Sequence, residues 1–182
     1  MRSLSLGCAA LAVACLAPGD CGAPGAVAAS APLDVSLAPH GASGSSPPVV
    51  ALAAESPQLT VVLTNKDPHT LRLWKDSCSW GYRNLSFELI DAAGRSITVT
   101  RAERGWEKNV PAWDDLPSGG SLSTDVTLSA GEWRGLPVLK HGEQRIVRMR
   151  AIYRSEAGFD AMTHHVWVGA ARSADMDVIL SN

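Results

Sequence analysis

Apolar side chains recur at alternate positions in one segment after another between residues 59 and 180. Within residues 85–90, for example, Leu85, Phe87 and Leu89 alternate with Ser86 and Glu88. The same spacing occurs in residues 59–63, 97–99, 122–128, 147–153, 166–168 and 176–180. Because successive side chains of a strand point to opposite faces, this pattern is typical of strands that bury one face. The chain is therefore predicted to be all-β, an antiparallel β-sandwich of eight or nine strands.

The N-terminal segment has the pattern of an export signal. Arg2 is its only basic residue, and the apolar run that follows is 14 residues long, whereas a membrane-spanning helix needs about 20. Residues 1–28 are therefore predicted to be a signal peptide, cleaved after Ala28. The alternative is a lipoprotein signal, because Ala12-Val13-Ala14-Cys15 is similar to a lipobox with Ala12 in place of the usual leucine. Cys15 would then carry a lipid anchor. Either route predicts an exported protein, periplasmic, secreted or on the outer surface, without a transmembrane span.

The next segment differs in composition from everything that follows it. Residues 29–48 are rich in Ala, Ser, Gly and Pro and are predicted to be a disordered linker, because they cannot bury enough apolar surface to fold. Residues 33–37 are the exception, since they alternate and could form a first edge strand. The folded domain is predicted to occupy residues 49–182.

Charge and cysteine content narrow the possible partners. The first 56 residues hold one of the chain's 16 basic residues and three of its 18 acidic ones, so residues 57–182 carry no net charge. Such a balance gives no reason to expect nucleic acid, whose phosphates require a basic surface. Cys78 is the only cysteine of the predicted domain, which excludes an internal disulfide. It is expected to be a small buried apolar residue or a free thiol.

Several short motifs carry a resemblance to known proteins. Residues 87–94 (FELIDAAG), residues 116–120 (LPSGG) before a strand, and residues 79–82 (SWGY) resemble uncharacterised exported bacterial proteins with an immunoglobulin-like β-sandwich. This resemblance implies the fold and no activity. A more distant likeness, through the F-x-x-x-D-x-x-G hairpin from Phe87 to Gly94, is to the bacterial proteinase-inhibitor β-sandwich. Export and long extra loops argue against transferring an inhibitory function.

Long segments between the predicted strands are the candidate binding region. Tight turns at 66–68 and 92–94 place the segments 75–84, 102–120 and 155–162 together at the other end of an antiparallel sandwich. The candidate binding residues there are Trp80, Tyr82, Trp106, Lys108, Trp113 and Asp114. A loop tryptophan suits stacking on a sugar or a partner side chain. The alternative is that these rings fold inward and close the end of the sandwich. Trp133 is expected at the opposite end.

Other conspicuous residues have plainer interpretations. Trp74 and Trp167 are out of phase with the apolar positions of their segments, so either they lie on the solvent face or another element, such as residues 49–56, covers them. The neighbouring His164 and His165 would point to opposite faces of a strand, so no metal site is expected. Three arginines on the polar side of the longest predicted strand are expected to pair with acids such as Glu88, or else to receive an anionic partner. They are Arg148, Arg150 and Arg154.

The expected function follows from these features. No catalytic motif and no cofactor site is evident, so the expectation is a non-enzymatic immunoglobulin-like domain with a binding or structural role in the cell envelope. The partner would be an unknown protein or glycan. The alternatives are a carbohydrate-binding module that uses the loop tryptophans and a protease inhibitor that uses residues 102–120.

Overall fold

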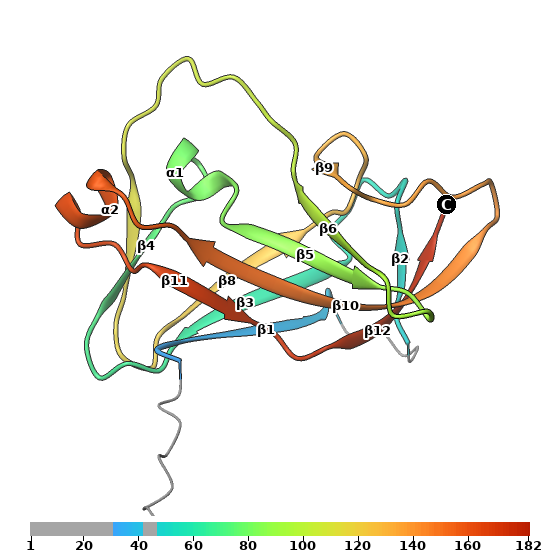
Figure 1. Ribbon diagram of the computed structural model, residues 1–182, viewed down its shortest axis with the longest axis horizontal. Helices are drawn as coiled ribbons and strands as arrows, with labels where there is room; N and C mark the ends of the chain where they lie inside the picture. The colour runs from blue at the N-terminus through green and yellow to red at the C-terminus, as the bar shows by residue number, and fades with distance from the viewer. Residues whose placement is uncertain (1–30, 42–46) are drawn as a thin grey trace, which may run out of the picture.

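A computed structural model describes residues 31–41 and 47–182. The predicted signal peptide and Cys15 lie outside the described residues and stay predictions. Within the described part, the chain forms twelve strands and two short helices, arranged in three sheets (Figure 1). Pairing is antiparallel except between the last strand and a short strand at residues 49–51. The all-β class predicted from the alternation is confirmed.

The largest sheet has seven strands. Its order is β2 (Val49–Ala51), β12 (Met176–Ser181), β10 (Gln144–Ser155), β5 (Leu85–Ile90), β6 (Ser96–Arg101) and β9 (Trp133–Arg134), with β11 (Gly169–Arg172) also on β10. β10 is 12 residues long and organises this sheet. One of its edges pairs with β5, and its other edge is shared, since β12 pairs with its first half and β11 with its last four residues.

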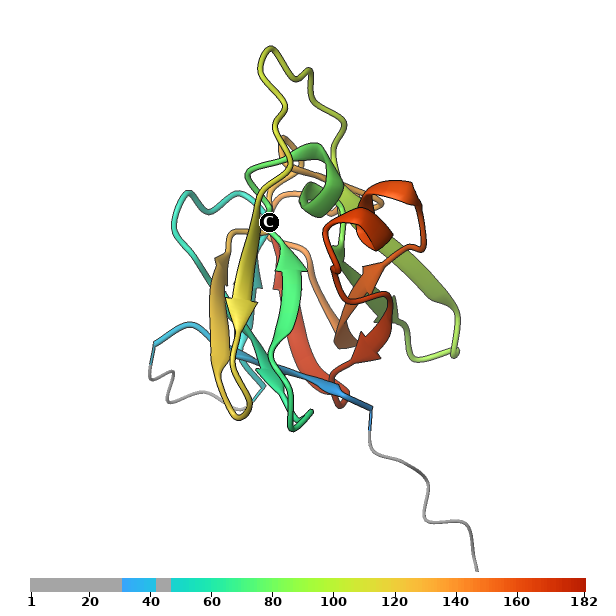
Figure 2. The ribbon, with the colours of Figure 1, turned by 90° about the vertical axis from the view of Figure 1, so that its left-hand side faces the viewer.

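A second layer covers one face of this sheet. It contains β1 (Leu33–Pro39), β3 (Leu59–Asn65) and β8 (Ser121–Val126), with β3 in the middle. β4 (Leu71–Trp74) and β7 (Trp113–Leu116) form a separate antiparallel pair, which lies beside β3 and β8 in Figure 2. Apolar side chains from both layers make one buried cluster, in which Phe87, Val126 and Met149 are at most 1% exposed. The predicted inward face is therefore confirmed at its central positions.

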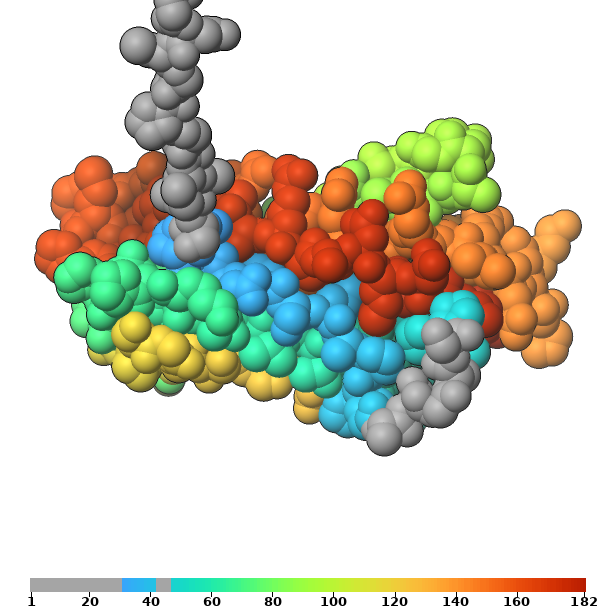
Figure 3. All heavy atoms as spheres, turned by 90° about the horizontal axis from the view of Figure 1, so that it is seen from below, coloured from blue at the N-terminus to red at the C-terminus, as the bar shows by residue number. Residues whose placement is uncertain are grey.

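The N-terminal boundary of the domain differs from the prediction. β1 lies inside the range 29–48 that was predicted to be a linker, and it is the edge strand considered for residues 33–37. Leu33 and Val35 are buried in the core, so the fold begins before Val49. Figure 3 shows β1 in blue between β3 and the red strands β11 and β12. β1 thus closes the gap between the two layers on that face.

The number of strands also exceeds the prediction of eight or nine. β2, β9 and β11 are two to four residues long, too short to display alternation. β7 lies within residues 102–120, which were predicted to be one long loop, because Trp113 to Leu116 pair with β4. Residues 166–168, predicted as a strand, precede β11 instead.

The turn after β3 is fixed by a buried side chain. Asn65 is 0% exposed, and its Nδ2 donates to the carbonyl oxygens of His69 and Leu116, each at 2.8 Å. Its Oδ1 accepts from the backbone N–H of Asp67 at 2.8 Å. One amide therefore shapes the turn and also ties it to the end of β7. Buried amides are stable in a core when they are satisfied in this way.

Candidate binding site

The predicted clustering of long segments at one end of the molecule is observed. α1 (Ser79–Tyr82) and α2 (Phe159–Thr163) lie side by side there, beneath the loop of residues 102–112 (Figures 1 and 2). The loop is attached to α1, because Asn109 accepts from the backbone N–H of Ser79 and donates to its hydroxyl. Neither helix was predicted, since four or five residues cannot show a helical period.

Trp74 is the centre of an aromatic group at this end, which we call the tryptophan cluster. Its ring lies 5.9 Å from Trp80, 6.2 Å from Trp113 and 5.7 Å from His164, measured between centroids. Trp74 is buried, and the buried Cys78 belongs to the same cluster. The covering element predicted for Trp74 therefore exists, but it is α1 and the segment after α2. Residues 49–51 of the proposed cover instead form β2, paired with β12.

A glycine allows α1 to approach β4 so closely. Gly81 is buried, and a Cβ atom at its position would overlap the carbonyl oxygen of Lys75. The indole N–H of Trp80 then donates to the Asp160 carboxylate at 2.8 Å, which joins α1 to α2. Trp80 is half-buried with a fixed orientation.

The remaining candidate residues divide between two other environments. Tyr82 packs edge-on against Trp106, and the Arg104 guanidinium lies 4.0 Å from the Trp106 ring. Asp114 is on β7, where it pairs with Lys75 at 3.2 Å, and Lys108 is exposed on the loop. The structure therefore brings Trp80 and Trp113 together through Trp74, brings Tyr82 and Trp106 together, and leaves Lys108 outside both groups.

Counting strands between the tight turns predicted Trp133 at the opposite end, and this prediction is wrong. It is 1% exposed, stacks edge-on against Phe87, and pairs with Arg101 at the end of β6. The Arg101 guanidinium lies over both the Trp133 ring and the Tyr82 ring, at 4.6 and 5.6 Å from their centroids. Trp133 is therefore a core residue beneath the candidate end. β9 has only two residues, so it was not counted as a strand, and counting strands could not predict at which end Trp133 lies.

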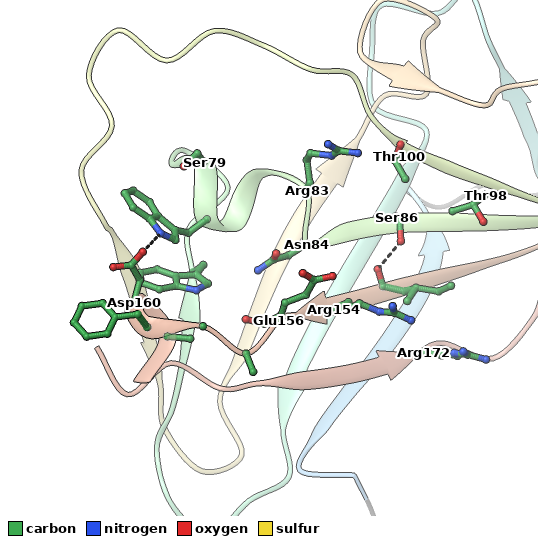
Figure 4. Close-up of a pocket in the computed structure, with 18 of the residues that line it drawn as sticks. Ser79, Arg83, Asn84, Ser86, Thr98, Thr100, Arg154, Glu156, Asp160 and Arg172 are labelled. Atoms are coloured by element: carbon green, nitrogen blue, oxygen red, sulfur yellow. Dashed lines mark hydrogen bonds between the residues drawn. The ribbon is translucent and has the colours of Figure 1, made fainter. Parts of the chain in front are cut away.

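A groove of about 860 Å³ opens between the two helices and the outer face of the large sheet, and we call it the α1–α2 groove. Its floor comes from β5, β6, β10 and β11, and its lining is shown in Figure 4. Ser86, Thr98 and Thr100 provide hydroxyls on the floor, and Trp80 and Phe159 provide aromatic rings from α1 and α2. Small-molecule sites have volumes of roughly 300–1,000 Å³, so the groove is large enough for a ligand.

The polar side of β10 behaves as predicted at one of its arginines. Arg150 pairs with Glu88 at 2.6 Å across the β10–β5 ladder. The hydrogen bond from Arg150 lowers the pKa of Glu88, and the charge of Arg172 contributes in the same direction. Arg148 and Arg150 also approach Asp175, at 3.5 and 3.6 Å. These two arginines are therefore neutralised by Glu88 of β5 and by Asp175, which lies just before β12.

Arg154 and Arg172 are different. Among the residues that the structure describes, no carboxylate lies within ion-pair distance of either guanidinium. Both side chains are exposed and line the α1–α2 groove (Figure 4). The third arginine of the groove, Arg83, has only a 3.6 Å contact with Glu103, which is itself 90% exposed. The floor of the groove therefore presents two guanidinium groups that no described carboxylate pairs with, beside Glu88, which pairs with Arg150.

A half-buried amide holds the groove's wall to its floor. Asn84 follows α1. In the amide orientation that gives both its oxygen and its nitrogen a hydrogen-bond partner, Nδ2 donates to the carbonyl oxygens of Trp80 and Arg154 at 3.1 and 3.0 Å. The Tyr153 hydroxyl lies 3.4 Å from the same amide. Burial raises the pKa of Tyr153 to about 12, so this hydroxyl is a neutral donor. The spacing between α1 and β10 is thus fixed by hydrogen bonds.

A second, smaller pocket lies between the two layers. It measures about 260 Å³ and is lined mainly by apolar residues, with Tyr82 and Asp114 from the candidate set. That volume lies below the usual range for small-molecule sites.

His164 and His165 do not lie on a strand, as had been assumed, because His164 caps the end of α2 and His165 follows it with a φ of 54°. Within residues 31–41 and 47–182, no group of three or more His, Cys, Asp or Glu could hold a metal ion.

Acid should weaken the sheet beneath the groove. The pKa of Glu88 is lowered on folding from its ordinary 4.5, so the folded state takes up its proton only at lower pH. The stabilisation is therefore complete above pH 4.5 and is lost as the pH falls below that value. We expect Glu88→Gln to be less stable than wild type at pH 7, with a difference that shrinks by pH 3.5, measured by urea unfolding. A difference that stays constant over this range would contradict the Arg150–Glu88 assignment.

The sequence did not identify every residue of the groove. Arg172 and Asn84 were not predicted as site residues, because Arg172 ends a short strand and Asn84 is a single polar residue before β5. Phe159 and Asp160 lie on the unpredicted α2. Arg154 was identified, through its place on the polar side of β10. The useful signal was the alternation of arginines on that strand, read together with the acids available to neutralise them.

Fold and groove together define the class: a mostly antiparallel all-β protein with a polar, open groove at one end of its largest sheet. No helix of the described segments has the length and apolar character needed to cross a membrane. A comparison with known protein families, with curated proteins and with solved structures finds no match for this chain. The functional argument therefore depends on the geometry of the groove.

Proposed function

We propose that the chain is an exported, non-enzymatic immunoglobulin-like domain that binds a component of the cell envelope in its α1–α2 groove. Two packed β-layers with mainly antiparallel pairing support the immunoglobulin-like class. The sequence of residues 1–28 supports export, with lipidation of Cys15 as the alternative processing route. Within the proposed class, the partner is a glycan or protein of the envelope.

One observation carries the binding role. Arg154 and Arg172 extend from the sheet into the groove, and no carboxylate of the described residues forms an ion pair with either of them. Charged groups on a rigid scaffold beside aromatic rings are typical of recognition sites. Of the six residues proposed from the sequence, Trp80 is the one in this groove. Trp113 and Trp106 contact other rings instead, which supports a role in holding the end of the fold together.

A steric block tests this proposal without changing any charge. Thr98 is exposed on the groove floor, so Thr98→Trp should fill the groove. The matched control is Val138→Trp, because Val138 is 94% exposed and does not line the groove. The purified protein is passed over immobilised envelope components, namely neutral and acidic polysaccharides, peptidoglycan fragments and peptides. We expect wild type and Val138→Trp to be retained by the same component, and Thr98→Trp to lose at least about tenfold in affinity.

Two results would overturn the binding role. One is that Thr98→Trp is retained as well as wild type, and the other is that no component of the panel retains the protein. Circular dichroism of both variants provides the folding check, since a surface substitution on a strand should change the free energy of unfolding by no more than about 0.5 kcal/mol.

A further inference from the structure

We infer that the ligand of the α1–α2 groove is an acidic oligosaccharide, whose carboxylate binds between Arg154 and Arg172. This inference rests on the proposed binding role of the groove and names the ligand class. It depends on three properties of the lining: two guanidinium groups that form no ion pair with a described carboxylate, a row of hydroxyls, and aromatic rings from the helices.

The strand register places the two arginines together. Arg172 pairs with Ile152 across the β11–β10 ladder, and Arg154 is two residues further along β10, so both lie on the outer face. Diagonal neighbours of this kind are about 7–8 Å apart at their Cα atoms, within reach of long side chains. Two like charges this close are stabilised by an anion, and guanidinium groups match the planar geometry of a carboxylate.

Apart from Glu88, which pairs with Arg150, the rest of the floor is suited to neutral polar groups. Thr98 and Thr100 of β6, and Ser86 of β5, present side chains on the same outer face. The Ser86 hydroxyl has only a long bond, 3.4 Å, to the Ile152 carbonyl oxygen. Hydroxyls both donate and accept, as the hydroxyls of a sugar ring do. A ligand with one anionic group and many hydroxyls therefore matches this floor.

Aromatic rings complete the match. Phe159 on α2 is 77% exposed and lines the groove, and Trp80 is fixed by its bond to Asp160. Such rings offer a flat apolar surface to the C–H face of a sugar.

Acidic groups in the lining disfavour the most highly charged ligands. Glu156 lies beside Arg154, just after β10, and Asp160 lies on α2, as Figure 4 shows. A ligand with a charge on every unit and no neutral surface, such as a polyphosphate, would meet these carboxylates. An oligosaccharide separates its carboxylates by uncharged rings, so one carboxylate can lie at the arginines while a ring lies at α2.

The test uses trisaccharides of galacturonate, mannuronate and glucuronate, each compared with its methyl ester, in calorimetric titrations of the purified protein. The ester removes the charge and keeps the sugar. We expect at least one acid to bind at least about tenfold more tightly than its ester, with an affinity that falls as salt rises. An acidic peptide of three glutamates is the comparison for a protein ligand.

The matched variants are two double substitutions with equal changes in charge. Arg154→Gln/Arg172→Gln should weaken binding of the acid at least about tenfold. Arg95→Gln/Arg145→Gln alters exposed arginines that lie outside this groove, so binding should be unchanged. Equal binding of acid and ester, preference for the peptide, or full binding by the first double variant would overturn the inference. If a neutral sugar or a peptide binds and Thr98→Trp blocks it, the binding role of the groove stands and only the acidic-sugar assignment fails.

Discussion

Phe87→Ala should lower the free energy of unfolding by about 3–5 kcal/mol, the largest effect that we expect of a single substitution. Phe87 is 0% exposed on β5, in the middle of the large sheet. Its ring contacts Trp133 edge-on at 5.1 Å between centroids, so the substitution removes an aromatic pair as well as buried area. The cavity would lie between the two layers, where neighbouring strands prevent collapse. Urea unfolding followed by circular dichroism gives the measurement.

Phe159→Ala is the matched control for Phe87→Ala. Phe159 is 77% exposed on α2, so its loss should change the free energy of unfolding by no more than about 0.5 kcal/mol. Equal effects of the two substitutions would contradict the placement of the core between the layers.

Asn65→Ala should cost about 2–4 kcal/mol, because one buried and two half-buried hydrogen bonds to the backbone are lost at once. The His69 and Leu116 carbonyl oxygens lose their donor, and the Asp67 N–H loses its acceptor. Asn65→Asp keeps the acceptor but removes both donations, so it should be destabilised to a similar extent.

Asn109→Ala is the control for Asn65→Ala. Asn109 also makes side-chain bonds, to Ser79, but at an exposed site where water replaces them. Its loss should cost no more than about 0.5 kcal/mol. A cost below about 1 kcal/mol for Asn65→Ala, measured by the same unfolding experiment, would show that the turn does not depend on this amide.

The sequence predicted best those features that depend on neighbouring positions within one strand. Alternation identified β3, β5 and β10, and placed Phe87 and Met149 in the core. It also put Arg150 on a face where Glu88 could neutralise it, and the 2.6 Å pair confirms that expectation. Cys78 is buried, which is one of the two alternatives predicted for the lone cysteine of the domain. Each of these depends on a period of two or on composition.

Features that depend on contacts between distant segments were not predictable in the same way. Trp74 is covered by α1 and by His164, which lies some 90 residues further along the chain. No local sequence pattern predicts a contact over that distance. β7 was assigned to a loop because its four residues gain strand geometry only by pairing with β4. β1 lies in a segment of linker-like composition, where only the alternation of residues 33–37 indicated an edge strand, and Leu33 and Val35 of this strand reach the core.

The candidate site shows the same division. The alternating direction of antiparallel strands predicted that the segments around Trp80, Trp106 and Trp113 lie at one end, and they lie there in the structure. What the rings contact there could not be read from spacing, because indoles can equally pack on each other or face a ligand. The position of Arg154 diagonally beside Arg172 on one face depends on the β10–β11 register, which no sequence pattern specifies.

Amide chemical-shift mapping with a bound trisaccharide is the most direct test of the groove as the binding site. The protein is titrated with whichever of the three uronate trisaccharides binds most tightly, and shifts are assigned along the chain. We expect the largest changes in α1, in residues 152–160 and at Arg172, which surround the groove. Changes confined to the loop of residues 102–112, or to the turn at residues 91–95, would contradict the account.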